Sequence, residues 1–176
     1  MPGWRVDILC EDHRTERFLL RLCQRFGVGV LHVYIAPDGK GSASNWVMKQ
    51  YPLQTRRRRS KNYQKFFGLL VAVDGDEIGF HKRKEQLAKL APREGSEPIA
   101  LFVPTWAIET WLAFLCDAES VTEDQKLKKL EPYARLWKDG ETEAATILQA
   151  SQRWPGTAPL SSLADSVVEG RRIGLG

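Results

Sequence analysis

Four runs of apolar residues along the chain predict the strands of a buried sheet. The clearest run covers residues 69–73, five consecutive apolar residues followed by the acidic sequence Asp74-Gly75-Asp76. Apolar runs of this length are typical of strands that are buried on both faces, as in the middle of a parallel sheet. Residues 99–103 form another fully apolar run, and residues 4–10 and 28–35, which are apolar only in part, are also expected to form strands.

Apolar residues at helical spacing predict helices between these strands. In residues 15–26 the apolar side chains recur every three or four positions, and the arginines of this segment lie mostly on the other side. Short helices are also expected at residues 43–51, 82–90, 106–115 and 160–168, and residues 119 to about 152 have a helical composition. The final residues, 171–176, are expected to be weakly ordered.

This alternation of strands and helices predicts an α/β fold, a mostly parallel four-stranded sheet flanked by helices. With 176 residues and 43% hydrophobic residues, the chain is long enough for one substantial core. We expect a core at residues 1–118, interrupted by a basic, irregular insertion at about 36–65. Residues 119–176 would form a helical C-terminal extension.

Nothing in the sequence suggests a membrane protein. No apolar run approaches 18 residues, and Glu11 and Asp12 come before any signal-peptide core could form, so a cytoplasmic location is expected. The three cysteines, Cys10, Cys23 and Cys116, have no paired metal-ligand spacing, and we interpret them as buried thiols.

The net charge of +4 is unevenly distributed along the chain. Two basic blocks suggest a nucleic-acid partner, because neutralised phosphates release condensed counterions; the alternative is an ordinary solvated surface. In such a run His81 is better interpreted as a surface residue than as a general acid. The first block contains Arg56, Arg57, Arg58, Arg59, Lys61 and Lys65, and the second contains His81, Lys82, Arg83 and Lys84.

Four acidic residues follow predicted strands. Their side chains should meet at one edge of the sheet, because ligands of open α/β sheets bind beyond the carboxyl ends of the strands. This requires the first and third strands to be neighbours. Carboxylates grouped in this way favour a hard cation such as Mg²⁺, whereas an isolated Asp-x-Asp more often caps the next helix. The four residues are Glu11, Asp74, Asp76 and Glu109.

Residues 106–115 form a hydrophobic segment with a single charge, Glu109. An unpaired buried carboxylate costs several kcal/mol, so Glu109 must face a cation, a metal or a polar cleft. A structural ion pair with an arginine is the main alternative to a role in the site. Trp106 and Trp111 are interpreted as core residues rather than as surfaces for base stacking.

At this point the sequence resembles a known family. The segment Ile8-Leu9-Cys10-Glu11, followed by Thr15-Glu16 and later by Val73-Asp74-Gly75-Asp76, is similar to the Toprim domain of topoisomerases, bacterial primases, RNA-processing nucleases and overcoming-lysogenization-defect nucleases. The segment from Val103 to Leu112 resembles compact bacterial Toprim proteins. The resemblance covers residues 5 to about 117. One departure is Asp12, which stands where many Toprim sequences have glycine.

The resemblance implies a Rossmann-like fold and a nuclease that cuts DNA or RNA with Mg²⁺ or Mn²⁺. The metal ligands would be Glu11, Asp74 and Asp76, and Glu109 would complete a second metal position or act as general base. Secondary candidates are Asp12, Glu16 and a lysine from Lys126, Lys128 and Lys129.

The resemblance further implies a phage-defence role beside a separate ATPase, and a homodimer is compatible with it. The main alternative is a non-catalytic Toprim module that binds nucleic acid or builds a complex. Primase-like nucleotidyl transfer is a weaker alternative.

Overall fold

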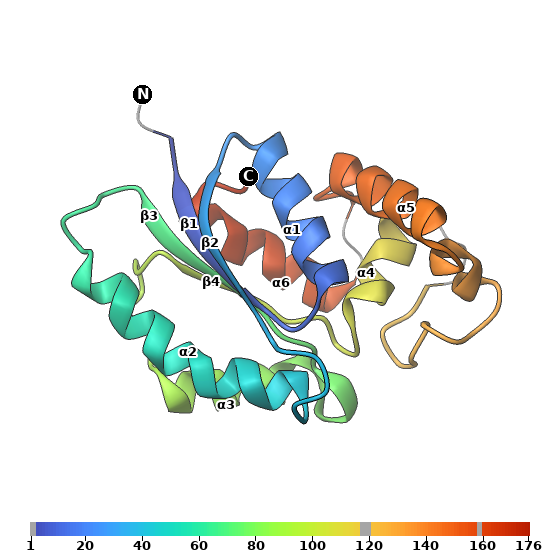
Figure 1. Ribbon diagram of the computed structural model, residues 1–176, viewed down its shortest axis with the longest axis horizontal. Helices are drawn as coiled ribbons and strands as arrows, with labels where there is room; N and C mark the ends of the chain where they lie inside the picture. The colour runs from blue at the N-terminus through green and yellow to red at the C-terminus, as the bar shows by residue number, and fades with distance from the viewer. Residues whose placement is uncertain (1–2, 117–120, 158–159) are drawn as a thin grey trace.

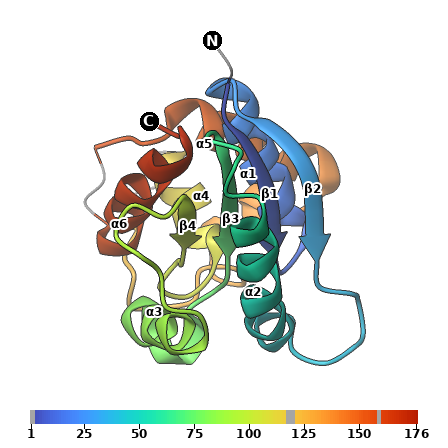
Figure 2. The ribbon, with the colours of Figure 1, turned by 90° about the vertical axis from the view of Figure 1, so that its left-hand side faces the viewer.

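The computed structural model describes residues 3–116, 121–157 and 160–176. Within these residues one four-stranded, entirely parallel sheet has the strand order β2-β1-β3-β4, visible edge to edge in Figure 2. The strands are β1 (Arg5–Cys10), β2 (Gly29–Ile35), β3 (Phe67–Ala72) and β4 (Ile99–Phe102). The predicted α/β fold and the predicted neighbourhood of the first and third strands are confirmed.

Helices cover both faces of the sheet (Figure 1). One face packs against α2 (Ala43–Ser60) and α3 (Gly79–Leu90). The opposite face packs against α1 (His13–Arg25), α4 (Ile108–Leu115) and α6 (Ser161–Gly170). A further helix, α5 (Gly140–Arg153), lies against α1 and α4. Burial on both sides explains why β3 is apolar throughout.

The segment predicted as an irregular insertion is instead the crossover between β2 and β3. It forms α2, which begins where the Ser42 side chain accepts a hydrogen bond from Asn45 N and runs through Pro52 to Ser60. Proline inside a helix removes one hydrogen bond and costs about 3 kcal/mol. Buried contacts made by side chains such as Val47 and Tyr51 offset this cost, so the helix continues.

The C-terminal part belongs to the same core as the sheet. Leu163, Ile173 and Leu175 are fully buried among residues of β1 and β3. After the short helix η3 (Arg171–Ile173), Gly174 adopts a left-handed conformation with φ 83°, and Leu175 N then donates to Gly170 O at 2.9 Å. The prediction that residues 171–176 are weakly ordered is therefore wrong.

The helix expected from residue 119 onward begins later than predicted. Residues 119 and 120 lie outside the described residues, and residues 121–132 form turns rather than a helix. Regular structure resumes with the short helix η2 (Tyr133–Trp137) and then α5. Across the described ranges, no helix is both long and apolar enough to cross a lipid bilayer.

The outer edge of β4 is covered by charged side chains. Leu101 N donates to Glu169 Oε2 of α6 at 3.0 Å, and Arg93 donates to Ile99 O at 2.7 Å. Arg93 and Glu169 also form an ion pair at 2.6 Å. Although burial opposes ionisation, the hydrogen bonds and charge of Arg93 keep the pKa of Glu169 below its usual value. Exposed strand edges are templates for unwanted pairing, and this ion pair occupies one of them.

Candidate functional site

The structure brings the acidic ends of β1 and β3 together. The two strands are paired in parallel, so Glu11 and Asp74 leave the sheet side by side. Glu11 Oε1 accepts a hydrogen bond from Asp74 N at 2.8 Å. The side chain of the first predicted metal ligand is thus joined directly to the backbone of the second.

The turn after β3 is fixed by the loop after β4. Gly75 N donates to Pro104 O at 2.9 Å, and Asp76 N donates to Trp106 O at 3.0 Å. A Cβ atom at Gly75 would lie 2.2 Å from Thr105 O, so this position requires glycine. Asp76 has φ 49°, a left-handed conformation that costs a non-glycine residue about 1 kcal/mol or more. Such strain is typical of functional sites.

The acids line a cleft of about 490 Å³, which we call the acid cleft. Its lining includes four carboxylates and the segment 126–130, which we call the lysine segment. Buried Leu127 anchors this segment, while Lys126, Lys128 and Lys129 are exposed beside the acids. Glu11 is not among the lining residues, but its side chain is bonded to Asp74 N. The lining acids are Asp12, Asp74, Asp76 and Glu109.

Burial and mutual repulsion raise the pKa values of the central acids. The pKa of Glu11 rises to about 7, chiefly because the side chain is buried and further because Asp76 and Asp12 are near; the hydrogen bond from Asp74 N opposes the rise. Burial, followed by the charges of Glu11 and Glu109, raises the pKa of Asp74 well above its ordinary value. Burial is the main cause for both groups, and the neighbouring carboxylates add to it.

The chemistry of these donors fits a hard divalent cation. Carboxylate oxygens are the ligands that Mg²⁺ and Mn²⁺ prefer, and a cation would relieve the repulsion that raises these pKa values. The side chains do not form a closed cage in advance: in the described part of the chain, no group of three or more His, Cys, Asp or Glu residues has metal-binding geometry. Glu11, Asp74 and Asp76 could hold such a cation together with water or phosphate oxygens.

Glu109 is buried and paired with an arginine. Its Oε1 accepts a hydrogen bond from Arg14 of α1, and Lys128 Nζ lies 3.7 Å from the same oxygen. Arg14 also donates to Glu143 Oε2 of α5 at 3.1 Å. The alternative of a structural ion pair is therefore observed, and Glu109 still lines the acid cleft next to the other carboxylates.

The two secondary acids have different environments. Asp12 caps α1, because its side chain accepts a hydrogen bond from Thr15 N at 2.8 Å, and it also lines the acid cleft. Glu16 Oε2 lies 2.8 Å from His13 Nδ1 in the first turn of the same helix. Asp12 is consequently the better placed of the two for an outer role in the site.

Several residues of the predicted basic surface have partners inside the protein. Arg58 is buried and donates to Phe67 O at 3.2 Å, and Arg59 donates to both oxygens of Glu97 at 2.7 and 2.9 Å. Arg83 is buried as well; it donates to Asp74 O at 2.9 Å and its Nη2 lies 3.6 Å from Asp76 Oδ2. We therefore assign Arg83 to the support of the acidic turn. Exposed or half-buried side chains remain at Arg56, Arg57, Lys61 and Lys82.

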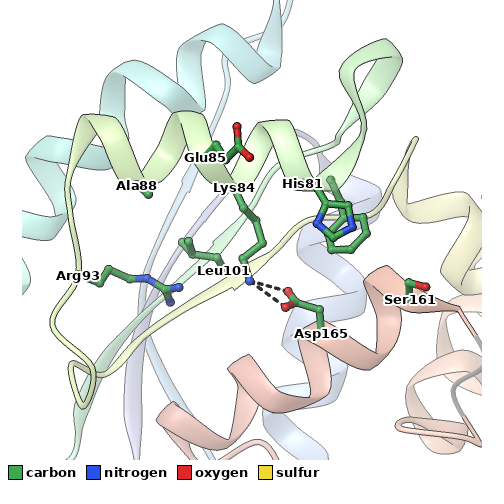
Figure 3. A pocket seen from close by; sticks show the side chains of 9 residues that line it. His81, Lys84, Glu85, Ala88, Arg93, Leu101, Ser161 and Asp165 are labelled. Carbon is green, nitrogen blue, oxygen red and sulfur yellow. Dashed lines mark hydrogen bonds and ion pairs between the residues drawn. The ribbon is translucent and has the colours of Figure 1, made fainter.

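Lys84 lies in a separate open groove of about 540 Å³ between α3 and α6 (Figure 3). Its Nζ contacts the two carboxylate oxygens of Asp165 at 2.7 and 2.9 Å and Glu169 at 3.2 Å. His81 also lines this groove, is exposed, and stacks against Phe80 with ring centroids 3.9 Å apart. Lys84 is therefore occupied by protein carboxylates, away from the acid cleft.

The two tryptophans considered in the sequence differ in the structure. Trp111 is fully buried and donates from Nε1 to Ser162 Oγ at 2.9 Å, as expected for a core residue. Trp106 is only half-buried, and Lys126 Nζ lies 5.4 Å from its ring centroid. The sequence alone does not reveal this contact or the partners of Arg14 and Arg83. These partners are distant along the chain or follow a turn whose geometry leaves no periodic pattern.

Comparison of the chain with protein-family models, with curated proteins and with solved structures finds no match. The residues and geometry of the acid cleft are therefore what indicates a function.

Proposed function

We propose that this protein is a Mg²⁺- or Mn²⁺-dependent nuclease that hydrolyses phosphodiester bonds of DNA or RNA in the acid cleft. The observation that carries the proposal is the hydrogen bond between Glu11 and Asp74 N, which unites the acidic ends of two adjacent parallel strands. The half-buried carboxylates of Glu11 and Asp74, with raised pKa values and a row of lysines nearby, support it.

Each part of the cleft has a role in this proposal. Glu11, Asp74 and Asp76 would hold the cation, which supplies charge stabilisation at phosphate and an activated water. The exposed lysines of the lysine segment would attract and orient the phosphodiester. Arg83, bonded to Asp74 O, would keep the acidic turn in position.

The decisive test is the removal of one carboxylate charge at a time. Asp74→Asn and Asp76→Asn should each lower Mg²⁺- or Mn²⁺-dependent cleavage of labelled DNA and RNA by about 100-fold, because the cation loses a ligand. Asp165→Asn, in the groove between α3 and α6, is the matched control and should retain activity. Undiminished cleavage by Asp74→Asn would refute the assignment.

A non-catalytic nucleic-acid-binding module is the second candidate. Glu109 is already paired with Arg14, so this carboxylate serves an ion pair within the fold, as the acids of such a module would. Nucleic-acid binding without cleavage by the unmodified protein, in the presence of either cation, would favour this candidate.

The proposed cellular role follows from the Toprim resemblance alone. We propose a cytoplasmic nuclease that acts in phage defence beside a separate ATPase. Affinity purification from cells challenged with phage should recover an ATPase with the unmodified chain and with Asp74→Asn, since the partner would not require catalysis.

A further inference from the structure

We propose that the acid cleft takes an unpaired nucleotide and that Trp106 is the residue on which its base stacks. The inference rests on the proposed function for the position of the phosphate and extends it to the class of substrate. Two observations support it: the volume of the cleft and the half-buried indole of Trp106 next to the cleft residue Ala107.

The cleft is suited in size to a segment of single strand. Its volume of about 490 Å³ lies within the range of sites that enclose small ligands, roughly 300–1,000 Å³. Its lining combines the four carboxylates with the lysine segment. In a double helix both faces of each base are already stacked on neighbouring pairs, so only an unpaired base could lie on an aromatic ring beside the cleft.

Trp106 is rigidly connected to the acidic turn. Its carbonyl oxygen accepts the hydrogen bond from Asp76 N at 3.0 Å, and the next residue, Ala107, lines the cleft. A base on this indole would therefore stand at a fixed position relative to Asp76. Aromatic side chains bind bases of any sequence because every base has a π-face.

The face of Trp106 is covered by a side chain that can leave it. Lys126 is exposed, and its ammonium lies 5.4 Å from the ring centroid, which is cation–π distance. An incoming base would take the place of this ammonium, and Lys126 would move to the adjacent phosphate. The backbone of the lysine segment need not move, because buried Leu127 and a 2.8 Å hydrogen bond from Trp137 Nε1 to Lys128 O hold it.

The test separates binding from cleavage by using the full chain with Asp74→Asn. Fluorescence anisotropy with a labelled oligothymidylate and with a hairpin duplex should show at least about tenfold tighter binding of the single strand. Adding Trp106→Ala should weaken single-strand binding by about tenfold, as expected for the loss of one stacked base, and Trp106→Phe should restore most of it. Duplex binding should change by less than about twofold.

Two controls distinguish stacking from charge and from misfolding. Trp4→Phe, directly before β1 and so at the amino-terminal ends of the strands, away from the acid cleft, should leave binding unchanged. Lys126→Ala should reduce the salt dependence of binding, whereas Trp106→Ala should not. Equal affinity for both oligonucleotides, absence of binding, or equal losses for both with Trp106→Ala would overturn the inference. Single-strand preference without cleavage by the unmodified protein would uphold it and reject hydrolysis.

Discussion

Glu11 shows how a residue of the proposed cation site can reduce stability. The pKa of its buried carboxyl is raised from an ordinary 4.5 to about 7. The folded protein therefore binds this proton more tightly than the unfolded chain does. The resulting stabilisation is present at low pH and is lost as the pH rises through about 7, where a buried carboxylate remains without its proton.

Glu11→Gln is accordingly expected to stabilise the cation-free protein in a pH-dependent way. With EDTA present, calorimetry at pH 8 should show a higher melting temperature for the variant. The corresponding gain in unfolding free energy is on the order of 1–2 kcal/mol at pH 8 and much smaller at pH 5. Glu85→Gln, at an exposed position of α3, is the control and should change neither value. A destabilised Glu11→Gln variant at pH 8 would contradict this account.

The residues of the acid cleft were partly predictable from the sequence. Glu11, Asp74 and Asp76 could be found because they follow apolar strands, and the direction of a parallel sheet then fixes their common edge. Arg14 could not be assigned to Glu109, since the contact joins helices 95 positions apart along the chain. The position of Trp106 depends on the strained turn at Asp76, which leaves no periodic pattern.

At the scale of elements, helix α6 stabilises the sheet through Glu169. This carboxylate is buried, accepts the Leu101 amide of β4 and pairs with Arg93 and Lys84. Removing one partner of a buried ion pair leaves the other charge uncompensated, which costs far more than losing an exposed pair.

Glu169→Gln is therefore expected to lower the unfolding free energy by about 3 kcal/mol, measured by urea denaturation at neutral pH. Asp165→Asn removes a more exposed partner of Lys84 and should cost less than about 1 kcal/mol. If the two variants lost similar amounts of unfolding free energy, the burial of the Glu169 ion pair would add nothing to stability.

Elements with a clear period were predicted correctly, and those decided by distant packing were not. Strands β1 to β4 and helix α1 follow from their apolar patterns. Helix α2 continues past Pro52, and the C-terminal residues are ordered by Ile173 and Leu175, because in both cases burial against the sheet outweighs local sequence preference.

At the scale of the whole molecule, only part of the basic charge is available to a polyanion. Arg56 and Arg57 are exposed on α2, whereas Arg59 of the same run is paired with Glu97. The double variant Arg56→Ala and Arg57→Ala should lower the slope of log affinity against log salt by about 1–2 if both contact phosphates. Arg59→Ala should leave that slope nearly unchanged. Oligonucleotide titrations at several salt concentrations would measure the slopes of both variants. An equal change of slope in the two would contradict the distinction between exposed and paired arginines.

The covered edge of β4 has a consequence for how copies of this protein can meet. Within the described residues β2 has no strand beyond it, while Glu169 and Arg93 occupy backbone groups along β4. Backbone hydrogen bonds between the sheets of two molecules would thus have to join the β2 edge of one molecule to the β2 edge of the other. Neither molecule would then have a second free strand edge. Growth of a continuous sheet through these edges would stop at two molecules, so the fold resists fibre formation without needing a closed barrel.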